Sequence, residues 1–196
     1  SLENDDVEFF CHSPFIKHCD EGDIIRNRAS LVFNVRFRAN GEHYDYLEVG
    51  DATWEDIEDI VNITKYHKNE DRLAWDLYNI PHHCSYLALN EDGQKGDKET
   101  EPKPLVKKLL LAGKQDAYII SSSKPIPDIK ESYDQVQPPH IQTRNAYEKY
   151  LSEGEQKLGQ LQDYNSQNAT RLTIEEIEEL LTIQPEIISA LSSKEL

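Results

Sequence analysis

The side chains best suited to chemistry occur in two short stretches, each at the end of an apolar run. Residues 47–52 read LEVGDA and residues 80–85 read IPHHCS. Asp and His are ligands for zinc and similar metals, and loops at strand ends are where α/β proteins place functional residues. We therefore predict that Asp51, His82 and His83 converge from neighbouring strands on a common pocket. A structural role for the two histidines is the competing interpretation.

The elements that would position these residues alternate along the chain. Apolar alternation and turn signals predict strands at residues 7–11, 30–38, 43–49, 75–80 and 116–121. Helical spacing predicts helices at 53–64, 105–112 and 143–151. Asn40-Gly41 predicts a tight hairpin turn, and Gly113 is expected to cap the second helix. This order predicts an α/β fold in which a mixed sheet carries its helices on one face.

Composition limits the possible classes of protein. The 196 residues allow one domain and a tail. The net charge of −16 argues against tight, nonspecific binding of nucleic acid, although a local phosphate site stays open. The sequence has no apolar run of about 18 residues, so we expect no membrane span. It shows no signal peptide and contains no methionine, which suggests a trimmed or partial chain.

The cysteines bear on the cellular compartment. Cys11, Cys19 and Cys84 are an odd number and do not have zinc-finger spacing. They fit either reduced thiols in a cytoplasmic protein or one disulfide with a free thiol. We expect reduced thiols and a cytoplasmic location.

The composition changes after residue 151. Residues 152–170 are polar and glutamine-rich, and an amphipathic helix is predicted from Thr173. A second short helix is predicted after Pro185. We divide the chain into a domain at 1–151 and a linker with a helical appendage at 152–196. The apolar stripe within 173–192 could pack on the domain, pair with a second copy or bind a partner, and packing on the domain is the default expectation.

Four motifs, in this order, resemble the second half of the metallo-β-lactamase fold, in the branch of ComEC-type competence proteins. They are NRASLV at 27–32, LEVGDA at 47–52, IPHHCS at 80–85, and YIIS at 118–121 followed by PPH at 138–140 and a helix. The resemblance covers about residues 6–150. It implies half of an αββα sandwich with a C-terminal helical tail.

The resemblance also implies roles for individual residues. Asp51 would bridge two divalent ions, zinc or possibly manganese, and His82 or His83 would bind one of them. Ser85 or His140 would orient the substrate or the ligands. Two adjacent metal ions with a bridging hydroxide would hydrolyse a phosphoester or a similar bond, as a nuclease-like enzyme does.

This sequence departs from the family at several places. The H-x-H-x-D-H motif of the first half is absent, Cys84 replaces a glycine and Pro138 replaces a histidine. One hypothesis is therefore the C-terminal half of a metal-dependent hydrolase, whose partner is the N-terminal half on the same or a separate chain. The alternative hypothesis is a degenerate scaffold that lacks catalysis and works as a protein–protein interaction module.

Overall fold

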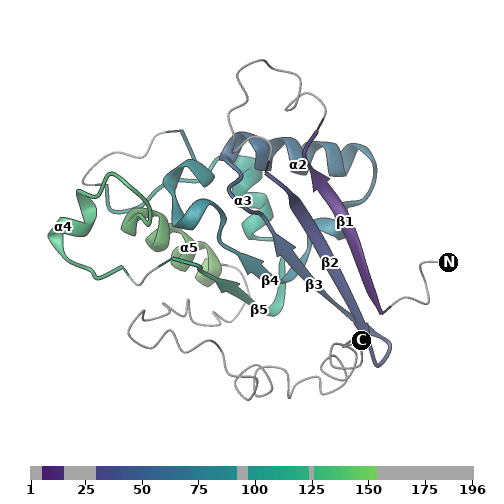
Figure 1. Cartoon of the computed structure of the whole chain (residues 1–196). Helices are drawn as coiled ribbons and strands as arrows, with labels where there is room; N and C mark the ends of the chain where they lie inside the picture. Colours follow the sequence, from purple (N-terminus) through teal and green to yellow (C-terminus); the bar gives the residue numbers. More distant parts are fainter. Residues whose placement is uncertain (1–5, 16–29, 92–96, 124–125, 154–196) are drawn as a thin grey trace, which may run out of the picture.

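A computed structural model describes residues 6–15, 30–91, 97–123 and 126–153 of the chain. These residues form an α/β fold with a five-stranded mixed sheet and helices packed on one of its faces (Figure 1). The predicted fold class is therefore confirmed. The predicted helical appendage at 173–192 lies outside the described residues, and the division at residue 151 stays a prediction.

The strands follow the chain order across the sheet, β1-β2-β3-β4-β5. They are β1 (Val7–Ser13), β2 (Val32–Ala39), β3 (Glu42–Glu48), β4 (Trp75–Asn79) and β5 (Gly113–Ile120). The first three pair antiparallel, and the predicted Asn40-Gly41 turn joins β2 to β3 with both residues at positive φ. β3, β4 and β5 pair parallel. The carboxyl ends of these three strands therefore meet at one edge of the sheet.

The longer helices lie on one side of the sheet (Figure 1). They are α2 (Trp54–Tyr66), α3 (Pro104–Leu110) and α5 (Ile141–Glu153), and the short turns are η3 (Glu70–Leu73), η4 (Pro81–Cys84), η5 (Tyr86–Ala88) and α4 (Lys130–Tyr133). At the start of α2 the Asp56 carboxylate accepts hydrogen bonds from the backbone N–H and the hydroxyl of Thr53, as the capping pattern predicts. Gly113 opens β5, so its predicted role as a helix cap is wrong.

The core lies between the sheet and the helices. Val32 and Leu47 of the sheet are 1% exposed and pack with Ile57, Ile60 and Val61 of α2. Further along the sheet Trp75 is fully buried, and its indole N–H donates to the Leu109 carbonyl of α3 at 2.9 Å. Burial of these large apolar side chains drives the packing of the helices on the sheet.

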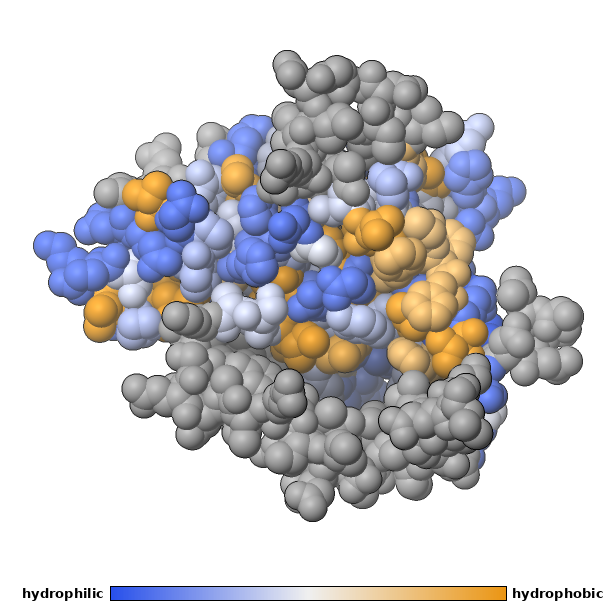
Figure 2. Space-filling view, in the orientation of Figure 1, coloured by the Kyte–Doolittle hydropathy of each residue, from blue (hydrophilic) through white to orange (hydrophobic). Residues whose placement is uncertain are grey.

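The other face of the sheet also carries apolar side chains. Phe9 is 69% exposed and Tyr118 is 42% exposed, and Phe9 contacts Phe33 edge-to-face at 6.4 Å. Figure 2 shows apolar atoms gathered over β1 and β2 on this side. We call this surface the open face. The predicted partner that would cover it stays a prediction. No helix among the described residues is long and apolar enough to cross a membrane.

Candidate functional site

The predicted site residues lie where the parallel strands end. Asp51 follows β3, and His82 and His83 follow β4 in the η4 turn. In open α/β sheets, ligands bind outside the carboxyl ends of the strands. A backbone hydrogen bond from His82 N–H to the Gly50 carbonyl, at 2.9 Å, joins the two loops directly. The structure thus brings Asp51 and the histidine pair together.

The turn that presents Asp51 depends on Gly50. Its φ of +55° is one that side chains rarely adopt, and a Cβ here would lie 3.2 Å from the Leu31 carbonyl oxygen. The turn closes with a hydrogen bond from Ala52 N–H to the Val49 carbonyl at 3.2 Å. Ala52 is buried, whereas the Asp51 side chain is 47% exposed. The backbone is therefore anchored, and the carboxylate is open to solvent.

The histidine loop has an unusual backbone. His82, His83 and Cys84 have φ values of 51°, 52° and 64°. Left-handed conformations cost energy in residues other than glycine and tend to occur at functional sites. Pro81 and Cys84 are buried on either side of the pair, so packing holds the strained turn in place.

A contact between an imidazole and a carboxylate joins the two loops. His83 Nε2 lies 3.7 Å from Asp51 Oδ1, and the side chains are 61% and 47% exposed. Burial lowers the pKa of His82; the Asp51 carboxylate opposes this shift and the neighbouring His83 adds to it. One imidazole and one carboxylate are thus presented to solvent, with a second, less basic imidazole beside them.

His140 is close to this cluster, but both of its ring nitrogens are engaged. Nδ1 accepts a hydrogen bond from Tyr86 N–H at 3.3 Å, and Nε2 lies 3.3 Å from the Val136 carbonyl oxygen. The ring is 2% exposed. Burial lowers the pKa of His140, the hydrogen bond to Val136 opposes this, and the charge of His82 lowers it further. His140 therefore holds the loop in place through these two contacts, and its predicted role in orienting the substrate or the ligands stays a prediction.

Ser85 also stabilises the local backbone, at the start of η5. Its hydroxyl accepts a hydrogen bond from Leu87 N–H at 3.3 Å, at the start of η5, and the residue is 2% exposed. This is the geometry of a helix N-cap. The predicted role of Ser85 in orienting a substrate stays a prediction.

Glu48 is a positioning residue that the sequence did not reveal. Its carboxylate accepts hydrogen bonds from Gly50 N–H at 3.0 Å, from the Asn79 amide at 2.9 and 3.0 Å, and from the Tyr46 hydroxyl. It thereby ties the end of β3 to the end of β4. The available signal was the strand alternation, which places Tyr46 and Glu48 on the same face next to the Gly-Asp turn.

The described residues do not fit the predicted dinuclear metal site. No group of three or more His, Cys, Asp or Glu side chains in the described part of the chain could hold a metal ion. Structural zinc is usually held by four protein ligands. The predicted metal ligands Asp51, His82 and His83 lack such further donors among the described residues. The zinc or manganese pair stays a prediction without a matching ligand group.

Comparison with known proteins points to a different family. Residues 145–187 match the family described as polysaccharide biosynthesis protein C-terminal. A UDP-glucose 4-epimerase of Rickettsia felis is 57% identical over 35 residues, which are 18% of this chain and 10% of the epimerase. The chain therefore spans about a tenth of the length of this relative. No solved structure matches the chain.

These findings correct the family assignment. The resemblance to metallo-β-lactamase-fold, ComEC-type proteins is wrong, and so is the metal-dependent hydrolase that it implied, because the matching proteins belong to polysaccharide biosynthesis and epimerisation. The degenerate-scaffold alternative rested on the same resemblance and falls with it. The physical reason is that each motif is only three to six residues long. An apolar strand followed by a polar loop is common to many α/β sheets.

Proposed function

We propose that the protein works in polysaccharide biosynthesis and that its α/β domain binds a sugar group at the carboxyl edge of β3, β4 and β5. The observation that carries the proposal is the match of residues 145–187 to the polysaccharide biosynthesis family. The short identity with a UDP-glucose 4-epimerase supports the same process. A nucleotide sugar such as UDP-glucose is the ligand to test first.

The chemistry of the edge supports a hydroxyl-rich ligand. A carboxylate accepts hydrogen bonds and an imidazole both donates and accepts them, and a sugar offers several hydroxyls within a few ångströms. Asp51 and His83 are 3.7 Å apart and both open to solvent. Adjacent sugar hydroxyls can therefore contact both side chains at once.

We assign binding to these residues and do not assign a complete epimerase reaction. None of the eight glycines in the sequence are separated by a single residue, so the G-x-G-x-x-G fingerprint of dinucleotide-binding domains is absent from it. The strand order β1-β2-β3-β4-β5 also differs from the 3-2-1-4-5-6 order of those domains. The proposed location is the cytoplasm, in keeping with the free thiols of Cys11 and Cys84.

The test is a titration of the 15N-labelled full chain with UDP-glucose, with UDP and glucose as separate arms. We expect amide shifts concentrated at residues 49–52 and 80–85. Asp51→Asn should weaken binding at least tenfold, which corresponds to about 1.4 kcal/mol. Glu131→Gln is the matched control, because it removes one exposed carboxylate of α4 that lies outside residues 49–52 and 80–85.

Two results would overturn the sugar site. One is the absence of shifts with UDP-glucose and glucose. The other is binding that Asp51→Asn and Glu131→Gln weaken equally. If UDP causes the same shifts as UDP-glucose and glucose causes none, the site binds the nucleotide and the proposed sugar binding is wrong.

A further inference from the structure

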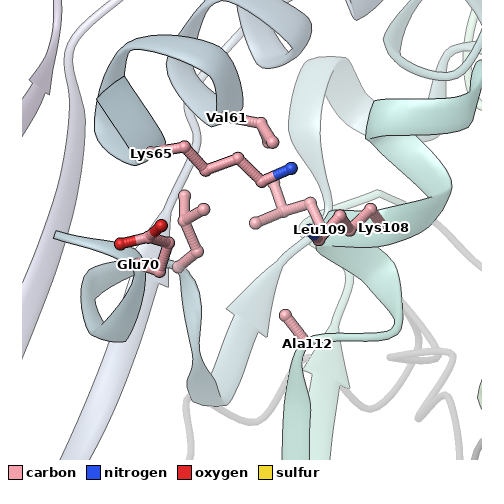
Figure 3. A pocket seen from close by; sticks show the side chains of 7 residues that line it. Val61, Lys65, Glu70, Lys108, Leu109 and Ala112 are labelled. Carbon is pink, nitrogen blue, oxygen red and sulfur yellow. The ribbon is translucent and has the colours of Figure 1, made fainter. Parts of the chain in front are cut away.

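A small pocket lies on the helical side of the molecule, and neither Asp51 nor His83 lines it. It has a volume of about 110 Å³ and lies between the end of α2, η3 and α3 (Figure 3). Its apolar lining comes from Val61, Leu73, Leu109 and Ala112. The space suits one branched aliphatic side chain.

Two lysines and one glutamate complete the lining. Lys65 comes from the last turn of α2, Lys108 from α3 and Glu70 from η3. Figure 3 shows the Lys65 side chain extending across the pocket toward α3, with the Glu70 carboxylate on the other side. On a chain of net charge −16, two lysines that face each other form a local positive site.

The two amines affect each other. A hydrogen bond with the Lys108 amine lowers the pKa of Lys65, desolvation and repulsion from the Lys108 charge add to this, and Glu70 opposes it. In the part of the chain that the structure describes, neither lysine forms an ion pair with a carboxylate. Negative charge placed beside the pocket would relieve the repulsion between the amines.

We propose that residues 173–182 of the same chain bind this pocket through one apolar side chain and the glutamates next to it. The segment reads TIEEIEELLT, so its four glutamates alternate with Ile174, Ile177, Leu180 and Leu181. In a helix the apolar residues form one stripe with carboxylates on both sides. This pattern complements an apolar pocket with two lysines at its rim.

The segment is also within reach. The Lys107 amine lies 4.4 Å from the centre of the Tyr150 ring, so α5 runs beside α3 close to Lys108. Residues 154–172 separate the end of α5 from the segment, and this linker spans about 60 Å when extended. A domain of about 150 residues has a radius of gyration of about 15 Å, so the linker is long enough.

The open face is a weaker candidate for the same segment. It is apolar at Phe9 and Tyr118, but it also carries the Glu48 carboxylate, which repels glutamates. Charge therefore favours the pocket between α2 and α3, where two lysines outnumber the one carboxylate of Glu70. The inference does not depend on the proposed sugar site.

The test is zero-length carboxyl–amine cross-linking of the full chain, read by mass spectrometry. We expect cross-links from Lys65 or Lys108 to Glu175, Glu176, Glu178 or Glu179 at least five times more often than from Lys68. Lys68 is an exposed lysine beyond the end of α2 that does not line the pocket. High salt should reduce these cross-links, because it screens exposed charges.

Two variants separate apolar docking from charge alone. Ile177→Ser with Leu180→Ser keeps every lysine and glutamate, and we expect it to reduce the cross-links at least fivefold. Phe9→Ser, on the open face, should leave them unchanged. A thermal melt of each variant checks that the domain is folded.

Three results would overturn the inference: Lys65 and Lys108 cross-link no more than Lys68, the serine double variant cross-links like the original chain, or Phe9→Ser abolishes the cross-links. Mixing 14N and 15N chains adds a further test. Cross-links found only between different chains would replace docking within one chain by association of two copies.

Discussion

Two regions of the sheet with ionisable side chains differ in how well these side chains are buried and paired with partners. In the first, Asp45 of β3 is buried and bonded to Arg36 and Lys114, both at 2.8 Å. In the second, Asp51 and His83 are open to solvent and 3.7 Å apart on a strained backbone. Charge alone therefore does not mark a binding site. Paired and buried charges hold a fold together, whereas exposed polar groups on a rigid turn can bind a ligand.

The buried Asp45 carboxylate already has its full set of cationic partners. Burial raises the pKa of Asp45, but hydrogen bonds and charges from Arg36 and Lys114 outweigh burial, and the pKa is lowered overall. Lys114 also pairs with Asp76 at 2.7 Å, and Arg36 pairs with Asp71 at 3.1 Å. No capacity to bind a ligand remains at Asp45.

The largest loss of stability is expected when this buried carboxylate is removed. Asp45→Ala should lower the free energy of unfolding by about 3–5 kcal/mol, because it leaves Arg36 and Lys114 without their shared partner. Chemical denaturation measures the change. A loss below about 1 kcal/mol would mean that Asp71 and Asp76 are sufficient partners, and it would weaken the contrast between the two regions.

The next effect is a dependence of stability on pH through His12 of β1. Burial lowers the pKa of His12 to about 4; a hydrogen bond to the Arg72 carbonyl opposes this shift and the Arg72 charge adds to it. The unfolded chain therefore takes up a proton near pH 6.5 and the folded chain does not. Stability should fall as the pH drops from about 6.5 to 4, by about 3 kcal/mol.

The His12 prediction is checked by denaturation at several pH values. His12→Gln should remove most of the slope between pH 6.5 and 4, since the side chain no longer titrates. Equal slopes for both proteins would assign the pH dependence to other groups.

A smaller effect is expected at the Gly50 turn. Gly50→Ala should cost about 1–3 kcal/mol, because alanine must adopt a φ of +55° and its Cβ lies 3.2 Å from the Leu31 carbonyl oxygen. Gly41→Ala is the matched control, since its φ is +82° and nothing lies within 4 Å of the added Cβ. Only Gly50→Ala should also weaken ligand binding at the carboxyl edge. Equal losses of stability would show that the contact with Leu31 adds nothing.

The smallest effect on stability is expected at Asp51 itself. Asp51→Ala should change the free energy of unfolding by less than about 0.5 kcal/mol, because exposed ion pairs contribute little. The denaturation midpoint measures this directly. A loss as large as that of Asp45→Ala would make Asp51 a structural residue and remove the contrast with the buried network.

The local pattern of residues determined most of the secondary structure. Alternation in β2, the Asn40-Gly41 turn, and the Thr53 start of α2 each depend on neighbours in sequence, so they were predictable. Gly113 was not, because the same glycine can end a helix or begin a strand. The short 3-10 turns were not predicted either, since they are set by packing.

The short motifs led to a wrong family assignment. A Gly-Asp turn and a Pro-His-His loop follow from strand ends in general, and they resembled a family that the comparisons do not support. The family match lies in residues 145–187. Their polar composition contains no pattern that indicates a particular chemistry.

The sequence by itself determined the α/β class, the acidic charge and the position of Asp51 and the two histidines at strand ends, because these depend on composition and local periodicity. Only the tertiary structure decided that Glu48 ties the two loops, that His140 is engaged beneath them, and that Lys65 faces Lys108 across a pocket. Each of these contacts joins side chains from different elements. Their distance in space is set by how strands and helices pack, which no local pattern encodes.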